Sequence, residues 1–118
     1  MNIGIVGSRR RDTKEDYWEV LQAFQELYSK GDVIVSGGCP QGGDRFAEII
    51  AKEYDIPIKL YRAEWEKYGR GAGFIRNTDI ARESDVLIAC VAEDRIGGTE
   101  DTIKKFIKFK SEDNLILV

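Results

Sequence analysis

The chain has 118 residues and a formal net charge of -3, and 42% of its residues are hydrophobic. This length and composition predict one globular domain that spans residues 1–118 and has an adequate core. The acidic balance argues against binding of long nucleic acid, which usually needs a basic face. No apolar stretch reaches membrane-spanning length, and a strand pattern begins at Asn2 without a charged leader. We therefore expect a soluble, cytoplasmic protein that does not bind a membrane.

Histidine is absent from the chain, and the only cysteines are Cys39 and Cys90. Histidine-dependent catalytic triads and histidine-ligated metal sites are therefore excluded. Two cysteines are too few for a disulfide framework, and they lack the spacing of metal ligands. We expect no metal site in the protein itself, and whether a metal accompanies a bound ligand stays open.

The first thirty residues predict a strand followed by a helix. Ile3–Val6 is an apolar run typical of a buried strand, and the apolar periodicity of Thr13–Ser29 indicates an amphipathic helix. Thr13, with Asp16 three residues later, favours a helix start at this point. Gly31 is placed where it could end the helix.

The middle of the chain repeats this alternation of strand and helix. Val33–Val35 predicts the second strand, and Asp44–Tyr54 carries the apolar face of a second helix. Pro57 introduces a third strand at Ile58–Tyr61. The residues from 62 to 76 form a connection longer than usual, and we expect it to be functional or mobile.

The last third of the chain predicts two further helices and two further strands. A helix is expected from about Ala72 to Glu83, followed by a strand at Val86–Val91. Thr99 can cap a last helix that runs through Phe106 or a little beyond. Leu115–Val118 then forms the fifth strand.

The predicted strands are apolar throughout rather than alternating, which indicates burial on both faces of the sheet. This pattern is typical of an α/β fold: a single Rossmann-like, doubly wound domain whose five-stranded, mainly parallel sheet has helices on both faces. In such folds a ligand binds outside the carboxyl ends of the strands, where the strand order reverses. The loops that follow the strands are therefore the expected site.

Glycine and arginine are concentrated in those loops. Ten of the twelve glycines and eight of the nine arginines fall in four stretches, which are residues 7–11, 37–45, 62–76 and 95–99. Glycine lets a backbone approach a ligand closely, and arginine offers a planar set of donors suited to phosphate or carboxylate. The connections at the opposite edge of the sheet show no such enrichment. We interpret the four stretches as an anion-binding rim.

The first stretch, Gly7-Ser8-Arg9, fits neither the dinucleotide-binding glycine fingerprint nor a Walker loop. Two interpretations remain open. Gly7 can be an ordinary turn residue beside a solvated charge run, or Ser8 and the loop amides can receive a phosphate while Arg9 adds positive charge.

The second stretch contains two glycine pairs, Gly37–Gly38 and Gly42–Gly43, in a loop that opens a helix. A helix N-terminus presents unpaired amides and a partial positive charge to an anion. Asp44 can cap this helix or contact the ligand, and both alternatives are kept. Cys39 is expected to be a small packing residue, because it lacks the histidine base of a cysteine nucleophile.

The third and fourth stretches add aromatic and hydroxyl groups to the rim. Arg76 and Asn77 are expected in the first turn of a helix, from which their side chains can reach the rim. Trp65 and Tyr68 can stack on a base or pack beneath their loop. In the fourth stretch, Gly97-Gly98-Thr99, we expect the threonine to cap the helix and also to face a phosphate.

Taken in order, these motifs resemble the SLOG superfamily of Rossmann-like nucleotide-binding domains, and in particular its YspA-like branch. The resemblance rests on Gly-Ser-Arg, Gly-Gly-x-x-x-Gly-Gly-Asp, Trp followed by Gly-x-x-Arg-Asn, and Gly-Gly-Thr, and it covers essentially the whole chain. Relatives in the superfamily include LOG phosphoribohydrolases, molybdenum cofactor carrier proteins and the DNA-processing protein DprA. The resemblance implies a binding site for a nucleotide or nucleotide-derived ligand. With Gly43 added from the second motif, the implied ligand-binding residues are Gly7, Ser8, Arg9, Gly37, Gly38, Gly42, Gly43, Asp44, Arg76, Asn77, Gly97, Gly98 and Thr99.

The chain departs from the phosphoribohydrolase motif Pro-Gly-Gly-x-Gly-Thr-x-x-Glu. Ile96 stands in place of the proline, one glycine is missing, and Thr102 stands in place of the glutamate. These differences argue against hydrolase activity, although Glu100 or Asp101 could supply a shifted carboxylate.

We therefore expect a binding, sensor or carrier domain for a small phosphorylated nucleotide, with no further cofactor. The alternative is an N-glycosidic hydrolase that acts on a nucleoside monophosphate or an NAD-derived nucleotide, with Glu100, Asp101 or Asp44 as its catalytic acid. A contact with single-stranded DNA is a third and weaker hypothesis, because the chain is acidic. A homodimer is compatible with the sequence, which leaves the base and the number of phosphates open.

Overall fold

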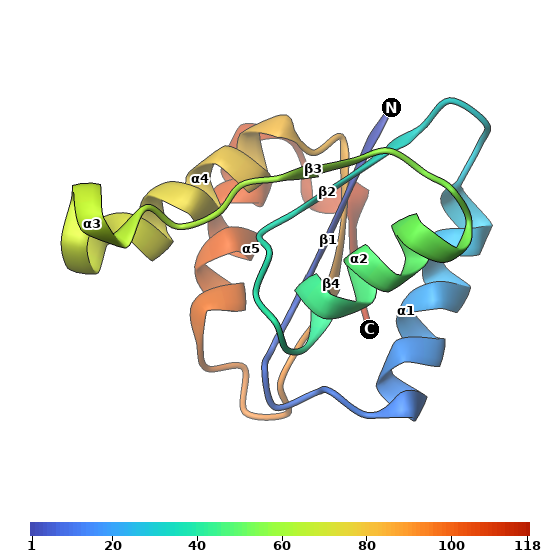
Figure 1. Cartoon of the computed structure of the whole chain (residues 1–118), viewed down its shortest axis with the longest axis horizontal. Coiled ribbons are helices and arrows are strands. Elements are labelled where there is room, and N and C mark those ends of the chain that lie inside the picture. Colours follow the sequence, from blue (N-terminus) through green and yellow to red (C-terminus); the bar gives the residue numbers. More distant parts are fainter.

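The computed structural model describes all residues, 1–118, and contains one sheet in which every neighbouring pair of strands is parallel (Figure 1). The order across the sheet is β3-β2-β1-β4-β5. The strands are β1 (Asn2–Gly7), β2 (Val33–Ser36), β3 (Ile58–Leu60), β4 (Val86–Cys90) and β5 (Leu115–Leu117). The predicted α/β class and five-stranded sheet are confirmed, and the sheet is wholly parallel.

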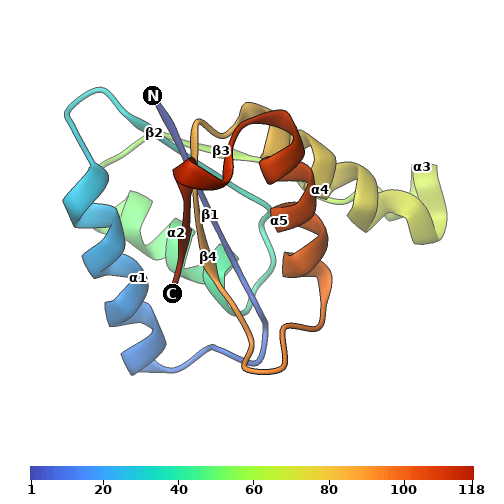
Figure 2. The same cartoon turned by 180° about the vertical axis from the view of Figure 1, so that it is seen from behind.

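Four helices of eleven to fourteen residues cover the two faces of this sheet (Figure 2). One face is covered by α1 (Lys14–Leu27) and α2 (Gly43–Glu53), and the other by α4 (Ala72–Glu83) and α5 (Gly98–Phe109). The remaining helices are short: α3 (Trp65–Tyr68), η1 (Gly69–Gly71) and η2 (Glu112–Asn114). Figures 1 and 2 both show α3 extending away from the sheet.

Alternation along the strands divides the core into two layers. Ile3 and Ile5 of β1 pack with α1 and α2, whereas Val6 of the same strand packs in the layer formed with α4 and α5. The same alternation separates Ile88 from Leu87 in β4. Successive side chains of a strand point to opposite faces. Both faces are covered here, and every one of these five residues is therefore apolar and buried.

The predicted helix ends are only partly right. Thr13 caps α1 as expected, and it forms a reciprocal capping box with Asp16. The helix ends at Leu27, however, so Gly31 belongs to the following turn, where its φ of 100° suits glycine. The long connection after β3 contains α3 and η1 before α4 begins at Ala72.

The cap expected at Thr99 is wrong, and the capping alternative for Asp44 is not observed. Each helix is capped by the backbone of a glycine, Gly42 or Gly97, with no side-chain cap bond. Asp44 and Thr99 therefore lie inside the first turns of these helices. Both glycines have positive φ angles, 73° and 134°, which a threonine or aspartate would adopt only with strain.

None of the helices combines the length and the apolar character that a membrane crossing requires.

Candidate functional site

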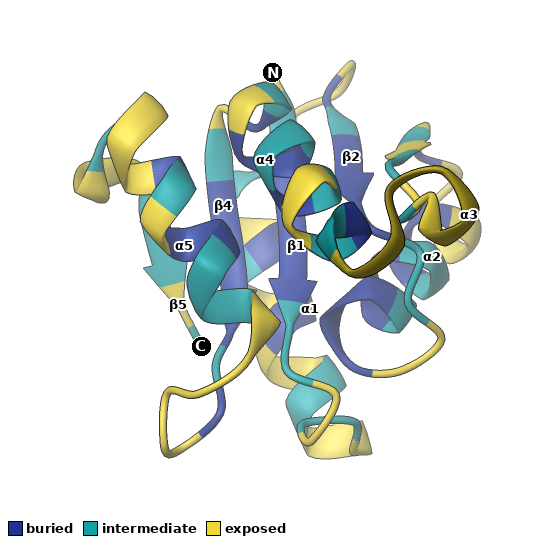
Figure 3. Ribbon diagram, turned by 90° about the vertical axis from the view of Figure 1, so that its left-hand side faces the viewer, coloured by how far each residue is buried: buried dark blue, intermediate teal, exposed yellow.

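A pocket of about 290 Å³ opens beyond the carboxyl ends of β1 and β4. These strands are neighbours at the centre of the sheet, and the chain continues from them towards opposite edges. Figure 3 shows both buried strands leading into exposed loops at this end. We call this cavity the switch-point pocket, and its lining residues are Val6, Gly7, Ser8, Arg9, Arg10, Cys39, Asp44, Arg76, Asn77, Ile80, Ala92, Ile96, Gly97, Gly98, Thr99, Glu100 and Thr102.

Many of the predicted site residues meet in this pocket, although they come from four separate segments. Those that line it are Gly7, Ser8, Arg9, Asp44, Arg76, Asn77, Gly97, Gly98, Thr99 and Glu100. Those that do not line it are Gly37, Gly38, Gly42, Gly43 and Asp101. The parallel sheet explains the gathering, because all its strands end at the same edge.

The glycines of the loop between β2 and α2 are required by the packing of the protein itself. A Cβ atom at Gly43 would overlap the backbone of Val6, and one at Gly42 would overlap the backbone of Ser8. The N-terminus of α2 is therefore packed directly against the end of β1. Gly7 belongs to the same close packing, since its Cβ position lies 3.0 Å from the amide nitrogen of Gly43.

Two arginines hold the other glycine pair of this loop. Nη1 of Arg76 donates to the carbonyl of Gly37 at 3.2 Å, and Nη1 of Arg62 donates to the carbonyl of Gly38 at 3.3 Å. A Cβ atom at either glycine would come within 2.9 Å of these guanidinium groups. Gly37 and Gly38 thus make room for arginine side chains and do not line the pocket.

The start of α5 has the opposite character, because the space around its glycines is open. A Cβ atom at Gly97 or Gly98 would meet no other atom within 4 Å. The amides of Gly98 and Thr99 lie in the first turn of α5, where a helix offers its N–H groups no internal acceptor. These amides and the helix dipole provide donors and partial positive charge at the pocket.

Four of the rim arginines are neutralised by carboxylates. Arg10 forms two bonds of 2.7 Å with Asp94, and this pairing lowers the pKa of Asp94 to about 2. The same guanidinium donates to the carbonyl of Ile96, so it ties the β1–α1 loop to the β4–α5 loop. Arg95 likewise forms a two-pronged ion pair with Glu100.

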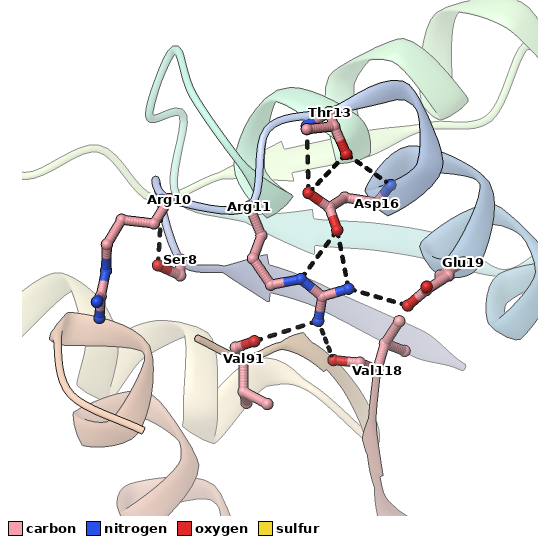
Figure 4. Close-up of polar contacts among 8 residues, drawn as sticks. All are labelled: Ser8, Arg10, Arg11, Thr13, Asp16, Glu19, Val91 and Val118. Carbon is pink, nitrogen blue, oxygen red and sulfur yellow. Dashed lines mark hydrogen bonds and ion pairs between the residues drawn. The ribbon is translucent and has the colours of Figure 1, made fainter. Parts of the chain in front are cut away.

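Arg11 and Arg45 have structural roles at the same edge. Figure 4 shows the Arg11 guanidinium between Asp16 and Glu19 of α1, and it also donates to the carbonyls of Val91 and Val118. Arg11 therefore joins the start of α1 to the ends of β4 and β5. Arg45 pairs with Asp12 at 2.8 Å.

The prediction of a single arginine rim is therefore too broad. Of the arginines that line the switch-point pocket, Arg9 and Arg76 form no ion pair, whereas Arg10 is paired with Asp94. The positive charge that is free to meet an anion in this pocket thus comes from Arg9, Arg76 and the start of α5. The sequence located the arginines, but it could not predict which carboxylate each of them pairs with.

Asn77 and Asp101 connect the two helices that flank the pocket. Nδ2 of Asn77 donates to the carbonyl of Gly98 at 3.3 Å and to Oδ2 of Asp101 at 3.2 Å. Asp101 also accepts from Nζ of Lys105 at 2.8 Å. Asp101 is thus engaged between α4 and α5 and does not line the pocket. Arg76 and Asn77 both lie in the second turn of α4 rather than in the first, where they were expected.

Asp44 is a buried carboxyl on the pocket lining, with 8% of its surface exposed. It accepts from the amide of Cys39 and lies within hydrogen-bonding distance of the hydroxyl of Ser36, each at 3.0 Å. Burial is the largest influence on its pKa, which is raised despite these contacts and the charge of Arg76. Asp44 thus stabilises the β2–α2 loop from inside the first turn of α2.

A second pocket of about 280 Å³ lies next to the first and shares Arg76 with it. Tyr61 and Tyr68 line this second pocket, together with Arg62. Trp65 lines neither pocket, although stacking on a base was one of the two roles predicted for it. The aromatic surface available beside Arg76 therefore comes from the two tyrosines.

The sequence analysis missed several residues of the switch-point pocket. Thr102 is 1% exposed and lines the pocket at the position where the phosphoribohydrolase motif has glutamate. Cys39 is partly exposed and lines the pocket too, although it was expected only to pack. Ile96, at 70% exposure, carried no signal other than its place before Gly97. No group of three or more histidine, cysteine, aspartate or glutamate residues could hold a metal ion.

Fold and pocket together define a single-domain α/β protein of Rossmann-like architecture with a polar pocket where its strand order reverses. No family model matches the chain, and no solved structure matches it. The Gene 61 protein of Mycobacterium phage D29 is 32% identical to it over 91 residues, which cover 72% of this chain and 72% of the phage protein. The chain belongs to the family of that phage protein.

Proposed function

We propose that the protein binds a nucleotide or another nucleotide-derived phosphorylated ligand in the switch-point pocket, as a sensor or carrier. The observation that carries this proposal is the start of α5, where Gly97, Gly98 and Thr99 line the pocket and no atom fills the space around the two glycines. A helix N-terminus of this kind is suited to a phosphate group.

Charge supports the same conclusion. Arg9 and Arg76 line the pocket without an ion-pair partner, in a chain where most other rim arginines have one. Ser8 adds a hydroxyl beside the backbone amides that follow β1. Charge-assisted hydrogen bonds from such groups to a phosphate are about twice as strong as neutral ones.

The two adjoining pockets suit the two parts of a nucleotide. At about 290 Å³ the switch-point pocket is near the lower end of the range for small ligands, and it suits a phosphate and a sugar better than a whole dinucleotide. The second pocket offers Tyr61 and Tyr68 for stacking on a base. Arg76 lies between the two parts, where it can contact a phosphate.

The motif resemblance to the SLOG superfamily also supports nucleotide binding. Its first and fourth motifs, Gly7-Ser8-Arg9 and Gly97-Gly98-Thr99, both line the pocket, as does the pair Arg76 and Asn77. The second motif contributes Asp44 and Cys39, but none of its glycines. We infer that its glycines support the loop instead of touching the ligand.

A thermal-shift screen with nucleoside mono-, di- and triphosphates tests this function. A ligand present at about 100 times its dissociation constant stabilises the folded protein by about 2.7 kcal/mol. We expect Arg9→Ala to abolish that gain without lowering the stability of the free protein, because Arg9 is exposed and unpaired. Arg76→Ala should also abolish it, at some cost in stability from the lost bond to Gly37.

Arg82→Ala is the matched control, since Arg82 lies on the same helix as Arg76 but outside both pockets. It should retain the full ligand-induced shift. If no phosphorylated nucleoside stabilises the wild-type protein, or if the Arg9 and Arg82 variants respond alike, the proposed site is wrong.

Hydrolysis of an N-glycosidic bond is a second candidate function, supported by the two carboxyl groups that line the pocket. Glu100 is held by Arg95, and Asp44 is buried, so the groups have very different environments. Asp101 is the weakest of the three candidates because of its bonds to Asn77 and Lys105. The test is to incubate the protein with a panel of nucleotides and to detect released free base by chromatography. Release that is lost in Glu100→Gln but not in Asp101→Asn would support hydrolysis over simple binding.

A further inference from the structure

No ion pair balances a negative charge on Asp44, although the charge of Arg76 is close enough to act on it. Its nearest cationic side chain across the loop, Arg76, donates to the carbonyl of Gly37 and to Oδ1 of Asn77, and no ion pair joins it to Asp44. Arg45, which lies on the same helix as Asp44, forms an ion pair with Asp12. A charged carboxylate with 8% exposure and no ion pair would be costly to bury.

A count of hydrogen atoms around Ser36 indicates the state of this carboxyl group. The serine hydroxyl has one proton but two oxygen neighbours, the carbonyl of Ile5 at 2.6 Å and Oδ1 of Asp44 at 3.0 Å. A carbonyl supplies no hydrogen, so the short contact with Ile5 takes the serine proton. The contact with Asp44 is then a hydrogen bond only if the carboxyl group supplies a proton of its own.

An ionised Asp44 would instead direct a charged oxygen at a lone pair of the serine oxygen inside the core. The other carboxyl oxygen, Oδ2, accepts from the amide of Cys39 at 3.0 Å and therefore needs no proton. A neutral acid with its proton on Oδ1 satisfies every one of these contacts. The asymmetry between the two oxygens matches a carboxylic acid better than a carboxylate.

Other charges around the site act in both directions. The ionised form of Asp44 is favoured by the N-terminus of α2 and by the charge of Arg76. It is also favoured by hydrogen bonds from the amides of Cys39 and Gly37, and from Ser36 when its hydroxyl donates to Asp44. Burial opposes it and is the larger effect, so the pKa is raised. The remaining charged groups of the pocket are Arg9, Arg10 and Glu100, and the last two are neutralised by Asp94 and Arg95.

We propose that Asp44 carries a proton in the free protein at pH values where exposed carboxyls are ionised, and that anion binding in the switch-point pocket depends on this proton. Ionisation would place a negative charge in the lining of a pocket that receives a phosphate, where the low dielectric strengthens repulsion. Asp44 is then a specificity-determining residue, which admits an anionic ligand only in its neutral form. The ligand half of this proposal rests on the proposed function, whereas the protonation half does not.

The protonation half is tested by unfolding experiments on Asp44→Asn, measured from about pH 4 to about pH 9. Asparagine reproduces the neutral acid, since its Nδ2 can donate to Ser36 while its Oδ1 accepts from Cys39. A group whose pKa is raised by folding stabilises the protein fully at pH values below its unfolded pKa. That stabilisation is lost as the pH rises through the folded pKa.

The wild-type midpoint of thermal unfolding should therefore fall as the pH rises above the unfolded pKa of an aspartate, and the Asp44→Asn midpoint should not show this decline. Asp12→Asn is the matched control, because Asp12 also holds the β2–α2 loop but has a lowered pKa. The unfolding midpoint of Asp12→Asn should lie below that of the wild type at high pH and should approach it in acid. Asp12 stabilises the protein above its unfolded pKa and loses that effect in acid.

The ligand half is tested with inorganic sulfate, which remains a dianion over the whole range. The dissociation constant of the wild-type protein should rise by up to about tenfold per pH unit above the pKa of Asp44, as expected for one linked proton. The Asp44→Asn variant should bind sulfate with little dependence on pH. If sulfate binds to neither protein, the ligand half fails with the proposed function, and the unfolding profiles still decide the protonation half.

Infrared difference spectra of the wild-type protein give a readout that does not depend on a variant. A protonated carboxyl band should persist at pH values where exposed carboxyls are ionised, and it should disappear as the pH is raised further. Parallel unfolding profiles for wild type and Asp44→Asn, or the absence of that band, would overturn the proposal.

Discussion

Two loops of this protein look alike in sequence, since each places a glycine pair at the start of a helix, yet they differ in what surrounds the glycines. At Gly42 and Gly43 the backbone of β1 and its loop occupies the space where a side chain would lie. At Gly97 and Gly98 that space is empty and opens on the switch-point pocket. A glycine motif can therefore meet either the packing needs of the protein or the needs of a ligand, and the surrounding atoms distinguish the two.

Charged residues repeat this contrast. In the β2–α2 loop, Asp12 accepts from the amide of Gly42 and pairs with Arg45, so the loop is held from several sides. The β4–α5 loop is held at its exposed part by Arg10, through Asp94 and the carbonyl of Ile96. We infer that the first loop is a rigid support and that the second presents the ligand-facing surface.

The largest expected effect is on the stability of the first loop. Gly43→Ala would place a methyl group into the backbone of Val6, and we expect it to lower the free energy of unfolding by about 3 kcal/mol or more. Denaturant unfolding measures this change. Gly71→Ala is the control, because a Cβ atom there meets nothing within 4 Å and its stability should stay close to wild type.

Gly98→Ala is the corresponding change in the second loop, and it should separate stability from binding. The added methyl group meets no protein atom, and alanine is favoured over glycine inside a helix, so we expect unchanged or slightly increased stability. Gly98 lines the pocket, however, and we expect the ligand-induced gain of about 2.7 kcal/mol to be reduced or lost. A variant that binds nucleotides as well as the wild type would contradict the role given to this loop.

Gly97→Ala tests the cost of the backbone conformation alone, because a Cβ atom at this position would meet no other atom within 4 Å. The φ of 134° at this residue lies in a region that only glycine adopts easily, and strain there costs about 1–3 kcal/mol. We expect a loss of stability in this range by thermal or denaturant unfolding. A smaller loss would indicate that the β4–α5 loop can relax, which would sharpen the contrast with the rigid first loop.

The smallest expected effect concerns the ion pair of Arg10 with Asp94, which is exposed to solvent. The pKa of Asp94 is lowered to about 2, so the pair stabilises the protein above the unfolded pKa of about 3.9 and loses its effect as the pH falls towards 2. Asp94→Asn should be slightly less stable than the wild type at neutral pH. The two unfolding curves should converge in acid, and a difference that persists there would mean that Asp94 acts through something other than its charge.

The sequence by itself determined the α/β class, the five strands and the edge at which polar residues gather. Strands such as Ile3–Val6 and Val86–Val91 are apolar on both faces, and only a sheet covered on both sides buries them fully. The Thr13 cap could also be predicted, since Thr13 and Asp16 form a local capping box. Such features depend on neighbours in sequence or on simple periodicity.

Only the tertiary structure decided which glycines and arginines face the pocket. Arg10 meets Asp94 across 84 positions, and Gly43 meets the backbone of Val6 across 37, so neither contact is visible in a local pattern. The same holds for Asp44, which does not cap α2 and whose proposed proton follows from the contacts of the Ser36 hydroxyl with Asp44 and with the carbonyl of Ile5. Contacts between distant segments depend on how the strands are ordered, and that order forms only when the whole sheet assembles.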